Sequence, residues 1–290
     1  MIAPRLSGRA TRIFCALLTL GVILQTPGAA FAAGEDPVRP LVFGFLPIVS
    51  PEKLVRRFEP LVDHLTETLG VPIVLETAPD YAEFLRRTHE DKRYDFLFTA
   101  PHFYYLAQRE AGYRVVARVD GPLMKAVIVA RRDSEIAAPE DLCGRRISTP
   151  DALALGTLLV RARLVDAGCD PDGDTTLVAT PSHNASLYSA YRGASDAAGL
   201  MTTPLARADP NVTVEMRIVA ETQSTPNMPF SVAPWVGAPR AEAFAGALVA
   251  LSTTEKGLAL LKHLGWPGLT PTGAEEYDVF ERFSKVVADQ

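Results

Sequence analysis

Residues 41–76 read LVFGFLPIVSPEKLVRRFEPLVDHLTETLGVPIVLE. The run Leu41–Leu46 is apolar and of strand length, and Ile73–Glu76 is a second such run. Between them, Lys53–Leu69 carries apolar side chains at helical spacing, and Gly70 ends this helix. Since two strands of one sheet that are joined by a helix run parallel, the stretch predicts a βαβ unit and an α/β fold.

The same alternation of strand and helix patterns continues on the carboxyl side of this unit. We expect further strands at Phe96–Phe98, Val115–Val119, Ala126–Ala130, Arg145–Thr149, Leu177–Ala179 and Ala197–Met201. We expect helices at Tyr81–His89, Phe103–Glu110, Leu155–Ala167, Asn184–Tyr191, Arg240–Leu251, Glu255–His263 and Ala274–Ala288, with a short helical turn at Pro139–Leu142.

The two successive α/β blocks predict two lobes, each a mostly parallel sheet flanked by helices. Gly121 and Pro122 break the pattern between the blocks, and from Val214 to Val236 the chain has an irregular strand pattern. We expect residues 36–121 plus 215–290 to form the first lobe and residues 122–214 the second.

The amino terminus has the layout of a secretory signal. Arginines precede the uncharged apolar run Ile13–Leu24, and small residues surround Ala32. A membrane-spanning helix needs about 20 apolar residues, whereas this run ends at Gln25. We therefore expect a signal peptide at residues 1–32, cleavage after Ala32 and a periplasmic mature protein.

The charge balance excludes one class of partner. The chain has 29 basic and 34 acidic residues, a net charge of −5, and removing the three arginines of the signal leaves 26 against 34, or −8. Nucleic-acid and anionic-membrane surfaces attract basic proteins, so neither is an expected partner. We expect a monomer that binds a small molecule.

Two cysteines remain after cleavage, Cys143 and Cys169. The periplasm is oxidising, so a disulfide can form there. Cys143 precedes the strand Arg145–Thr149 and Cys169 follows the next helix, and a helix that returns antiparallel to its strand brings these two ends together. We predict a Cys143–Cys169 disulfide, with two unpaired buried thiols as the alternative.

Ligands of parallel α/β sheets bind beyond the carboxyl ends of the strands, where loop amides and helix amino ends meet. In this chain polar and aromatic residues gather in the loops expected there, although helix caps and turns favour the same residue types. The loops are residues 47–50, 78–80, 99–102, 149–151, 182–184 and 202–203.

These loops also carry a resemblance that spans nearly the whole expected mature chain. Its pieces are Gly44-Phe45-Leu46-Pro47, Phe58-Glu59-Pro60-Leu61, Leu69-Gly70-Val71-Pro72, Asp80-Tyr81, Tyr94-Asp95-Phe96, Pro101-His102-Phe103-Tyr104, Asp133-Ser134-Glu135-Ile136, Glu140-Asp141-Leu142-Cys143-Gly144, Ser182-His183-Asn184 and Gly193-Ala194-Ser195-Asp196-Ala197-Ala198. In their order and spacing they resemble the phosphate, phosphite and phosphonate-type solute-binding proteins of bacterial ABC transporters.

The resemblance implies the type II periplasmic binding fold: two lobes, a hinge of crossing strands and a ligand buried between the lobes. It also implies that the protein hands a tetrahedral oxyanion to an inner-membrane ABC permease. Some relatives instead present arsenite or another solute to a membrane histidine kinase, so transport and sensing are both open.

The chain departs from the family in one loop. Family members present serines and threonines before the glycine that opens a helix of the second lobe, whereas this chain reads Leu153-Ala154-Leu155-Gly156-Thr157. Asp151 adds a negative charge, which opposes an anion unless it caps the helix. An oxyanion, a neutral molecule and a metal ion all stay open as ligands.

His183 is the first candidate ligand-binding residue, because the resemblance places it at a helix start that faces the cleft. A structural histidine is the alternative, and His89 and His263 are expected to be solvated. Core packing is the alternative for the aromatic candidates, and capping for the threonines. The other candidates are Pro47, Tyr81, Thr99, His102, Tyr104, Thr149, Asp151, Thr157, Ser182, Thr202 and Thr203, with Tyr105 as a further aromatic.

Catalytic motifs are absent from the sequence: it contains no Gly-x-Ser-x-Gly elbow and no Gly-x-Gly-x-x-Gly loop. We expect neither enzymatic activity nor a cofactor. His102, His183, Met201 and Met228 are of the types that bind copper or zinc. Their spacings match no compact metal motif, so a metal-binding protein is an alternative and not the expectation.

Overall fold

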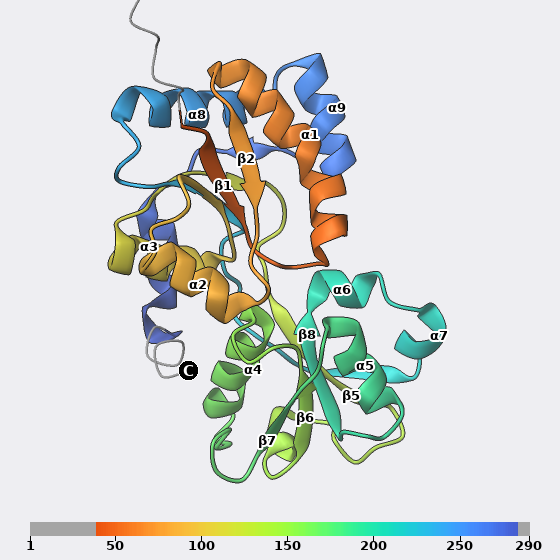
Figure 1. The fold of residues 1–290 in the computed structure, drawn as a ribbon. Coiled ribbons are helices and arrows are strands. Elements are labelled where there is room, and N and C mark those ends of the chain that lie inside the picture. The colour runs from red at the N-terminus through yellow and green to blue at the C-terminus, as the bar shows by residue number, and fades with distance from the viewer. Residues whose placement is uncertain (1–38, 284–290) are drawn as a thin grey trace, which may run out of the picture. The chain divides into compact units, whose positions relative to one another are not determined.

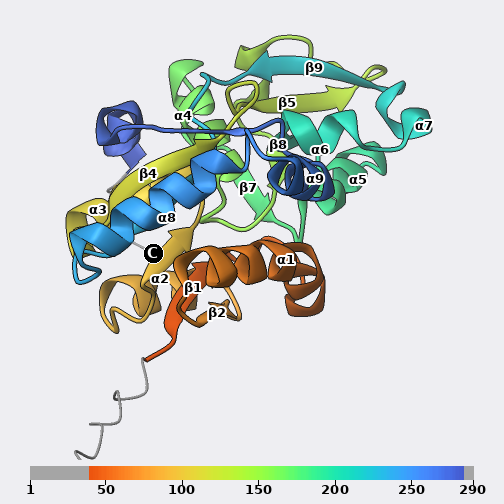
Figure 2. The same cartoon turned by 90° about the horizontal axis from the view of Figure 1, so that it is seen from above.

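The described part of the chain forms two mixed β-sheets with helices packed against them (Figures 1 and 2). The computed structural model describes residues 39–283, so the expected signal peptide and its cleavage after Ala32 lie outside the described residues. Both sheets belong to one compact unit, Val38–Gln290.

The first sheet has the strand order β11-β4-β10-β3-β1-β2. Strands β1, β2 and β3 pair in parallel, and β10 runs antiparallel between β3 and β4. The strands are β1 (Leu41–Phe45), β2 (Ile73–Glu76), β3 (Phe96–Phe98), β4 (Arg114–Val119), β10 (Pro229–Val232) and β11 (Leu269–Thr270). The helical elements are α1 (Pro51–Leu69), α2 (Tyr81–His89), α3 (Pro101–Ala111), α8 (Ala238–Ala250), α9 (Glu255–Leu264) and the 3₁₀ segment η2 (Ala274–Phe283).

The second sheet has the order β7-β6-β8-β5-β9. Here β6 pairs in parallel with β7 and β8, and β5 runs antiparallel between β8 and β9. The strands are β5 (Ala126–Arg131), β6 (Arg146–Thr149), β7 (Thr176–Ala179), β8 (Ala197–Met201) and β9 (Met216–Glu221). The helical elements are η1 (Pro139–Leu142), α4 (Leu155–Asp166), α5 (His183–Tyr191), α6 (Thr202–Ala206) and α7 (Pro210–Thr213).

Two segments cross between the sheets. Residues 120–125 connect β4 to β5, and residues 222–228 connect β9 back to β10. An antiparallel bridge joins them, in which the Met124 amide donates to the Thr225 carbonyl at 2.8 Å and the Thr225 amide donates back at 2.7 Å. In each sheet the strand that follows a crossing is inserted between two strands of that sheet. The first sheet is built from two separate stretches of chain, β1–β4 and β10–β11, whereas the second is built from the continuous stretch β5–β9.

The expected element boundaries differ from the structure in a few places. Strand β9 pairs with β5 in the second sheet, so the expected end of the second lobe at residue 214 lies too early. Helices α6 and α7 and strand β11 were not expected. The segment 274–283 is a 3₁₀ helix where an α-helix was expected, and the rest of that prediction lies beyond the described residues.

Aromatic side chains fill the core of the first sheet. Phe43, Phe45 and Phe98 are 2% exposed or less, and the ring centroids of Phe45 and Phe98 lie 5.9 Å apart. Gly44 is required between the two phenylalanines, since a Cβ atom there would lie 2.5 Å from the Tyr94 ring. A fully buried phenylalanine contributes about 1.5–3 kcal/mol through the hydrophobic effect, so this cluster anchors the strands that carry the loops.

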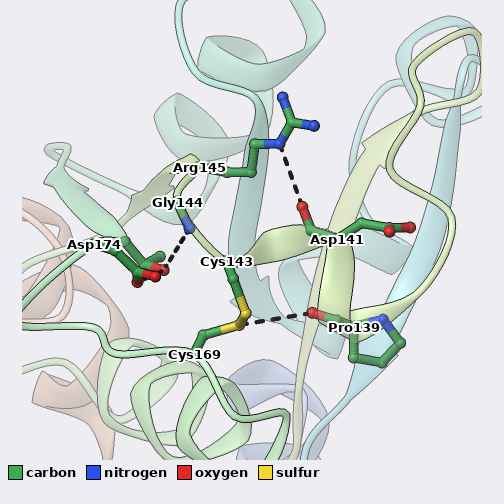
Figure 3. Close-up of a disulfide and its surroundings, with 8 residues drawn as sticks. Pro139, Asp141, Cys143, Gly144, Arg145, Cys169 and Asp174 are labelled. Carbon is green, nitrogen blue, oxygen red and sulfur yellow. Dashed lines mark hydrogen bonds between the residues drawn. A yellow bond between two sulfur atoms is a disulfide. The ribbon is translucent and has the colours of Figure 1, made fainter.

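The structure confirms the disulfide between Cys143 and Cys169, whose Cα atoms are 4.8 Å apart (Figure 3). Cys143 directly follows η1, and Cys169 lies three residues beyond α4. The Gly144 amide also donates to the Thr175 hydroxyl at 3.1 Å, which ties the same turn to the loop before β7.

Among residues 39–283 no single helix is long and apolar enough to cross a membrane. The helices α8 and α9 meet the length and composition criteria only when taken together, and they are bent by 81° relative to each other.

Candidate functional site

A pocket of about 630 Å³ lies where the two sheets and the crossing segments meet. Val119 ends β4 and Met201 ends β8, so the pocket is at the carboxyl ends of strands, as expected for an α/β fold. The walls come from the loop after β1, α1, both crossing segments, the start of α5, α6 and the turn after α9. The lining residues used below are Arg57, Asp120, Met124, His183, Met201, Thr202, Thr203, Arg207, Met228 and Trp266.

Two arginines give this pocket a positive charge. Arg57 lies on α1 and is half-buried, and Arg207 follows α6 of the second sheet and is exposed. Burial lowers the pKa of Arg57, and the positive charge of Arg207 lowers it further. One acidic side chain, Asp120, also lines the pocket, and it accepts a hydrogen bond from the Thr270 hydroxyl. Two arginines against this one aspartate leave a net positive charge on the lining. The described walls therefore favour an anion.

His183 is the first residue of α5 and faces this pocket from the second sheet. Its Nδ1 atom accepts a hydrogen bond of 3.4 Å from the Met201 amide, so the proton of a neutral ring resides on Nε2. Burial lowers its pKa to about 4. A neutral imidazole at this place can donate one hydrogen bond from Nε2 to an acceptor in the pocket.

Two more candidates line the same pocket, at the start of α6. The Thr202 hydroxyl donates to the Lys125 carbonyl at 3.3 Å, so it already has a partner in the crossing segment. Thr203 is exposed. Four of the sequence candidates therefore line one cavity with His183, namely Met201, Thr202, Thr203 and Met228.

The amino end of α4 is closed by apolar residues. Leu153, Ala154 and Leu155 are at most 9% exposed, and the Nε2 atom of His102 lies 2.9 Å from the Leu153 carbonyl oxygen. The Thr157 hydroxyl donates to the Asp151 carbonyl at 2.8 Å. The His102 ring and the Thr157 hydroxyl at this turn are therefore bonded to carbonyl groups of the chain itself.

Asp151 caps this turn. Its Oδ1 atom accepts a hydrogen bond of 2.8 Å from the Leu153 amide, so the carboxylate is engaged by the backbone of its own turn. Burial, and after it the charge of Asp151, raises the pKa of Tyr81 to about 12. Tyr81 is half-buried, and its ring contacts the Phe103 ring at 5.6 Å between centroids.

The other candidates occupy supporting positions around the strand ends. Thr99 is fully buried after β3, and its hydroxyl has no partner among the described residues. Pro47 is half-buried after β1, and Thr149 is buried at the end of β6. Ser182 caps α5, because its hydroxyl accepts the Ala185 amide at 3.1 Å. None of the four lines the pocket within residues 39–283.

Tyr104, one of the candidate ligand-binding residues, packs in the core and lies outside the pocket lining. It is fully buried in α3, its hydroxyl accepts the Val115 amide at 3.2 Å, and its ring contacts the Tyr277 ring at 4.8 Å between centroids. Tyr105 is buried as well. His89 is half-buried, with an Nε2 atom that has no partner among the described residues, and so it is not a solvated position, whereas His263 is exposed.

Sequence reasoning missed the arginines and the aromatic wall of the pocket. In the sequence, Arg57 is one of several charged residues on the polar face of α1. Arg207 directly follows α6, a helix that was not expected. Trp266 follows α9, and its ring centroid lies 5.1 Å from that of Phe98. No cluster of three or more His, Cys, Asp or Glu side chains that suits a metal is present in residues 39–283.

The fold and the pocket define a class of protein: two α/β sheets joined by crossing strands, with a solute site between them, as in type II periplasmic binding proteins. A family model described as "ABC transporter, phosphonate, periplasmic substrate-binding protein" matches residues 43–277. This chain belongs to that family, and it is therefore a periplasmic solute-binding component of an ABC transporter.

Solved structures show the same fold at low sequence identity. PhnD1 from Prochlorococcus marinus, in complex with methylphosphonate, has a TM-score of 0.74 at 16% identity, over 88% of this chain and 100% of that one. A Xanthomonas citri protein bound to ATP has a TM-score of 0.75 at 17% identity, over 86% of this chain and 97% of that one. A binding component of a Pseudomonas aeruginosa phosphonate transporter has a TM-score of 0.71 at 17% identity, over 87% of this chain and 89% of that one.

Proposed function

We propose that this protein binds an anionic solute of the phosphonate class in the pocket between its two sheets and delivers it to the ABC permease. The observation that carries the proposal is the composition of the pocket walls. They combine the guanidinium groups of Arg57 and Arg207 with the neutral donor His183, and they come from both sheets. A doubly charged phosphonate needs both charge compensation and donors.

The binding event follows from where these groups lie. Arg57 lies on α1, beside the first sheet. His183 begins α5 and Arg207 follows α6, both beside the second sheet, so a solute held by all three joins the two lobes. The crossing segments 120–125 and 222–228 are the connections through which the lobes rotate. The closed, loaded form is the one that the permease recognises.

Three finer points complete the proposal. The lobes divide within the two crossing segments, with β1–β4, β10 and β11 in the first lobe and β5–β9 in the second. The protein acts as a monomer with one solute per chain. The signal peptide is removed after Ala32, and the mature protein works in the periplasm.

A thermal-shift screen followed by calorimetry tests the ligand class. The panel contains phosphate, phosphite, methylphosphonate, aryl phosphonates, arsenite, sulfonates, amines and copper. A ligand at a hundredfold excess over its dissociation constant stabilises the native state by about 2.7 kcal/mol, which is readily measured. Phosphonates are expected to raise Tm and to bind with a stoichiometry of one. Stabilisation by copper, an amine or another uncharged or cationic solute, with none by any phosphonate, would overturn the proposal.

A further inference from the structure

The positive charge is concentrated at one end of the pocket. A second, shallower cavity of about 380 Å³ adjoins it and is lined by Lys53, Arg56 and His263. The two cavities share Arg57 and Arg207 among their walls. The shared arginines therefore mark the place where the main pocket opens into a basic recess.

The two arginines come from opposite lobes, and neither is neutralised. The Arg57 guanidinium donates to the Leu264 carbonyl at 2.7 Å and lies over the Phe58 ring, and it forms no ion pair within residues 39–283. Arg207 also has no ion pair in this part of the chain. Repulsion between the two positive charges opposes closure of the lobes. An anion bound between them attracts both arginines and so offsets that repulsion.

Other walls of the pocket are apolar. Trp266 is half-buried, and the side chains of Met124, Met201 and Met228 lie on the surrounding walls. Methionine thioethers and aromatic rings are favourable neighbours for a flat apolar group. A volume of about 630 Å³ is far larger than a bare tetrahedral anion needs and falls in the range typical for drug-sized ligands.

We propose that Arg57 and Arg207 form a two-lobe clamp on the phosphonate or phosphate head of an organic ligand whose ring-sized apolar substituent lies against Trp266 and the methionines. This inference rests on the proposed function and adds the position of the head and the size of the substituent. It places the anionic head at the arginines and not at the amino end of α4, where Leu153–Leu155 are buried.

Calorimetry with a matched ligand series tests the substituent. Phenylphosphonate and phenyl phosphate are expected to bind roughly ten- to a hundredfold more tightly than methylphosphonate, which is the gain from burying one ring. Benzyl alcohol, which has the ring without the charge, is expected not to bind measurably. The ratio between the two phenyl compounds distinguishes a phosphonate from a phosphate ester as the preferred source of the head.

Variants of the clamp and of the apolar wall test the geometry. Arg57→Gln and Arg207→Gln are each expected to weaken phenylphosphonate binding tenfold or more, and the double variant by less than the product, because both residues hold one anion. Arg240→Gln removes the same charge from an exposed position on α8 and is expected to leave affinity unchanged. Met228→Ala and Trp266→Leu are expected to weaken phenylphosphonate binding and to leave methylphosphonate binding as it was.

The possible results distinguish a wrong clamp from a wrong ligand class. If methylphosphonate binds as tightly as phenylphosphonate, or if Arg57→Gln and Arg207→Gln bind like Arg240→Gln, the clamp is wrong while phosphonate binding stands. If no phosphonate or phosphate ester binds the wild-type protein, the proposed function itself fails. Circular dichroism and Tm of each variant show whether a loss of affinity is a loss of folding.

Discussion

The Nε2 atom of His102, at the start of α3, lies 2.9 Å from the carbonyl oxygen of Leu153, just before α4. This hydrogen bond joins the first sheet to the second at a point outside the lining of the main pocket. His102 is 2% exposed, and burial lowers its pKa to about 4. A neutral imidazole that donates from Nε2 accounts for the contact.

His102→Ala is expected to destabilise the protein by about 2–4 kcal/mol, because it leaves the Leu153 carbonyl unpaired and opens a cavity. Urea unfolding followed by circular dichroism measures this. His102→Gln, which can still donate, should recover part of the loss. Equal stability of His102→Ala and of the exposed-site variant His263→Ala would show that the contact contributes nothing.

His183→Ala is expected to reduce ligand affinity about five- to a hundredfold, since an acceptor on the ligand loses its hydrogen bond inside the pocket, at a cost of roughly 1–3 kcal/mol. Titration calorimetry of the wild type and the variant gives the difference, with His89→Ala, outside the lining of both cavities, as the control. A direct hydrogen bond from His183 to the ligand is rejected if His183→Ala binds like wild type, or if its affinity falls only in step with its Tm.

Removal of the disulfide by Cys143→Ser with Cys169→Ser is expected to lower stability by about 2–4 kcal/mol, because the unfolded chain gains the freedom of the loop between them. Denaturant unfolding measures the loss, and mass spectrometry after alkylation without reduction measures the bond. Two alkylated thiols in protein isolated from the periplasm would contradict the pairing, and unchanged stability would contradict its contribution.

Stability is expected to fall between about pH 6.5 and pH 4. Burial lowers the pKa of His102 and of His183 to about 4, whereas histidines of an unfolded chain titrate near 6.5. In this window the unfolded state binds more protons, so each histidine lowers the free energy of unfolding by up to about 1.4 kcal/mol per pH unit as pH decreases. Urea midpoints between pH 7 and pH 5 should vary less in His183→Gln, and an identical slope would refute the role of His183.

Much of the fold could be predicted because apolar spacing reports local structure directly. The bounds of α2 and of β2 match the expected Tyr81–His89 and Ile73–Glu76. The boundary at residue 214 failed because β9 follows a region without clear alternation, and its pairing with β5 is a tertiary contact. A local pattern does not reveal to which sheet such a strand belongs.

The site was predictable only in part. His183, Thr202 and Thr203 are candidates because strand ends and a family motif mark their loops, and in the structure all three line the pocket. Arg57 was missed because the sequence does not distinguish a helix arginine that faces solvent from one that lines a cleft. The core position of Tyr104 was not predictable, because an aromatic residue at a helix start fits a ligand wall and a core equally well.

Small-angle scattering of the mature protein, alone and with saturating phenylphosphonate, tests most directly whether a solute is held between the two lobes. A ligand that contacts Arg57 on one side and His183 and Arg207 on the other is expected to close the lobes and reduce the radius of gyration. The Arg57→Gln variant should show a smaller change at the same ligand concentration. An unchanged radius of gyration, with binding proven by calorimetry in the same buffer, would contradict a site that closes on its solute.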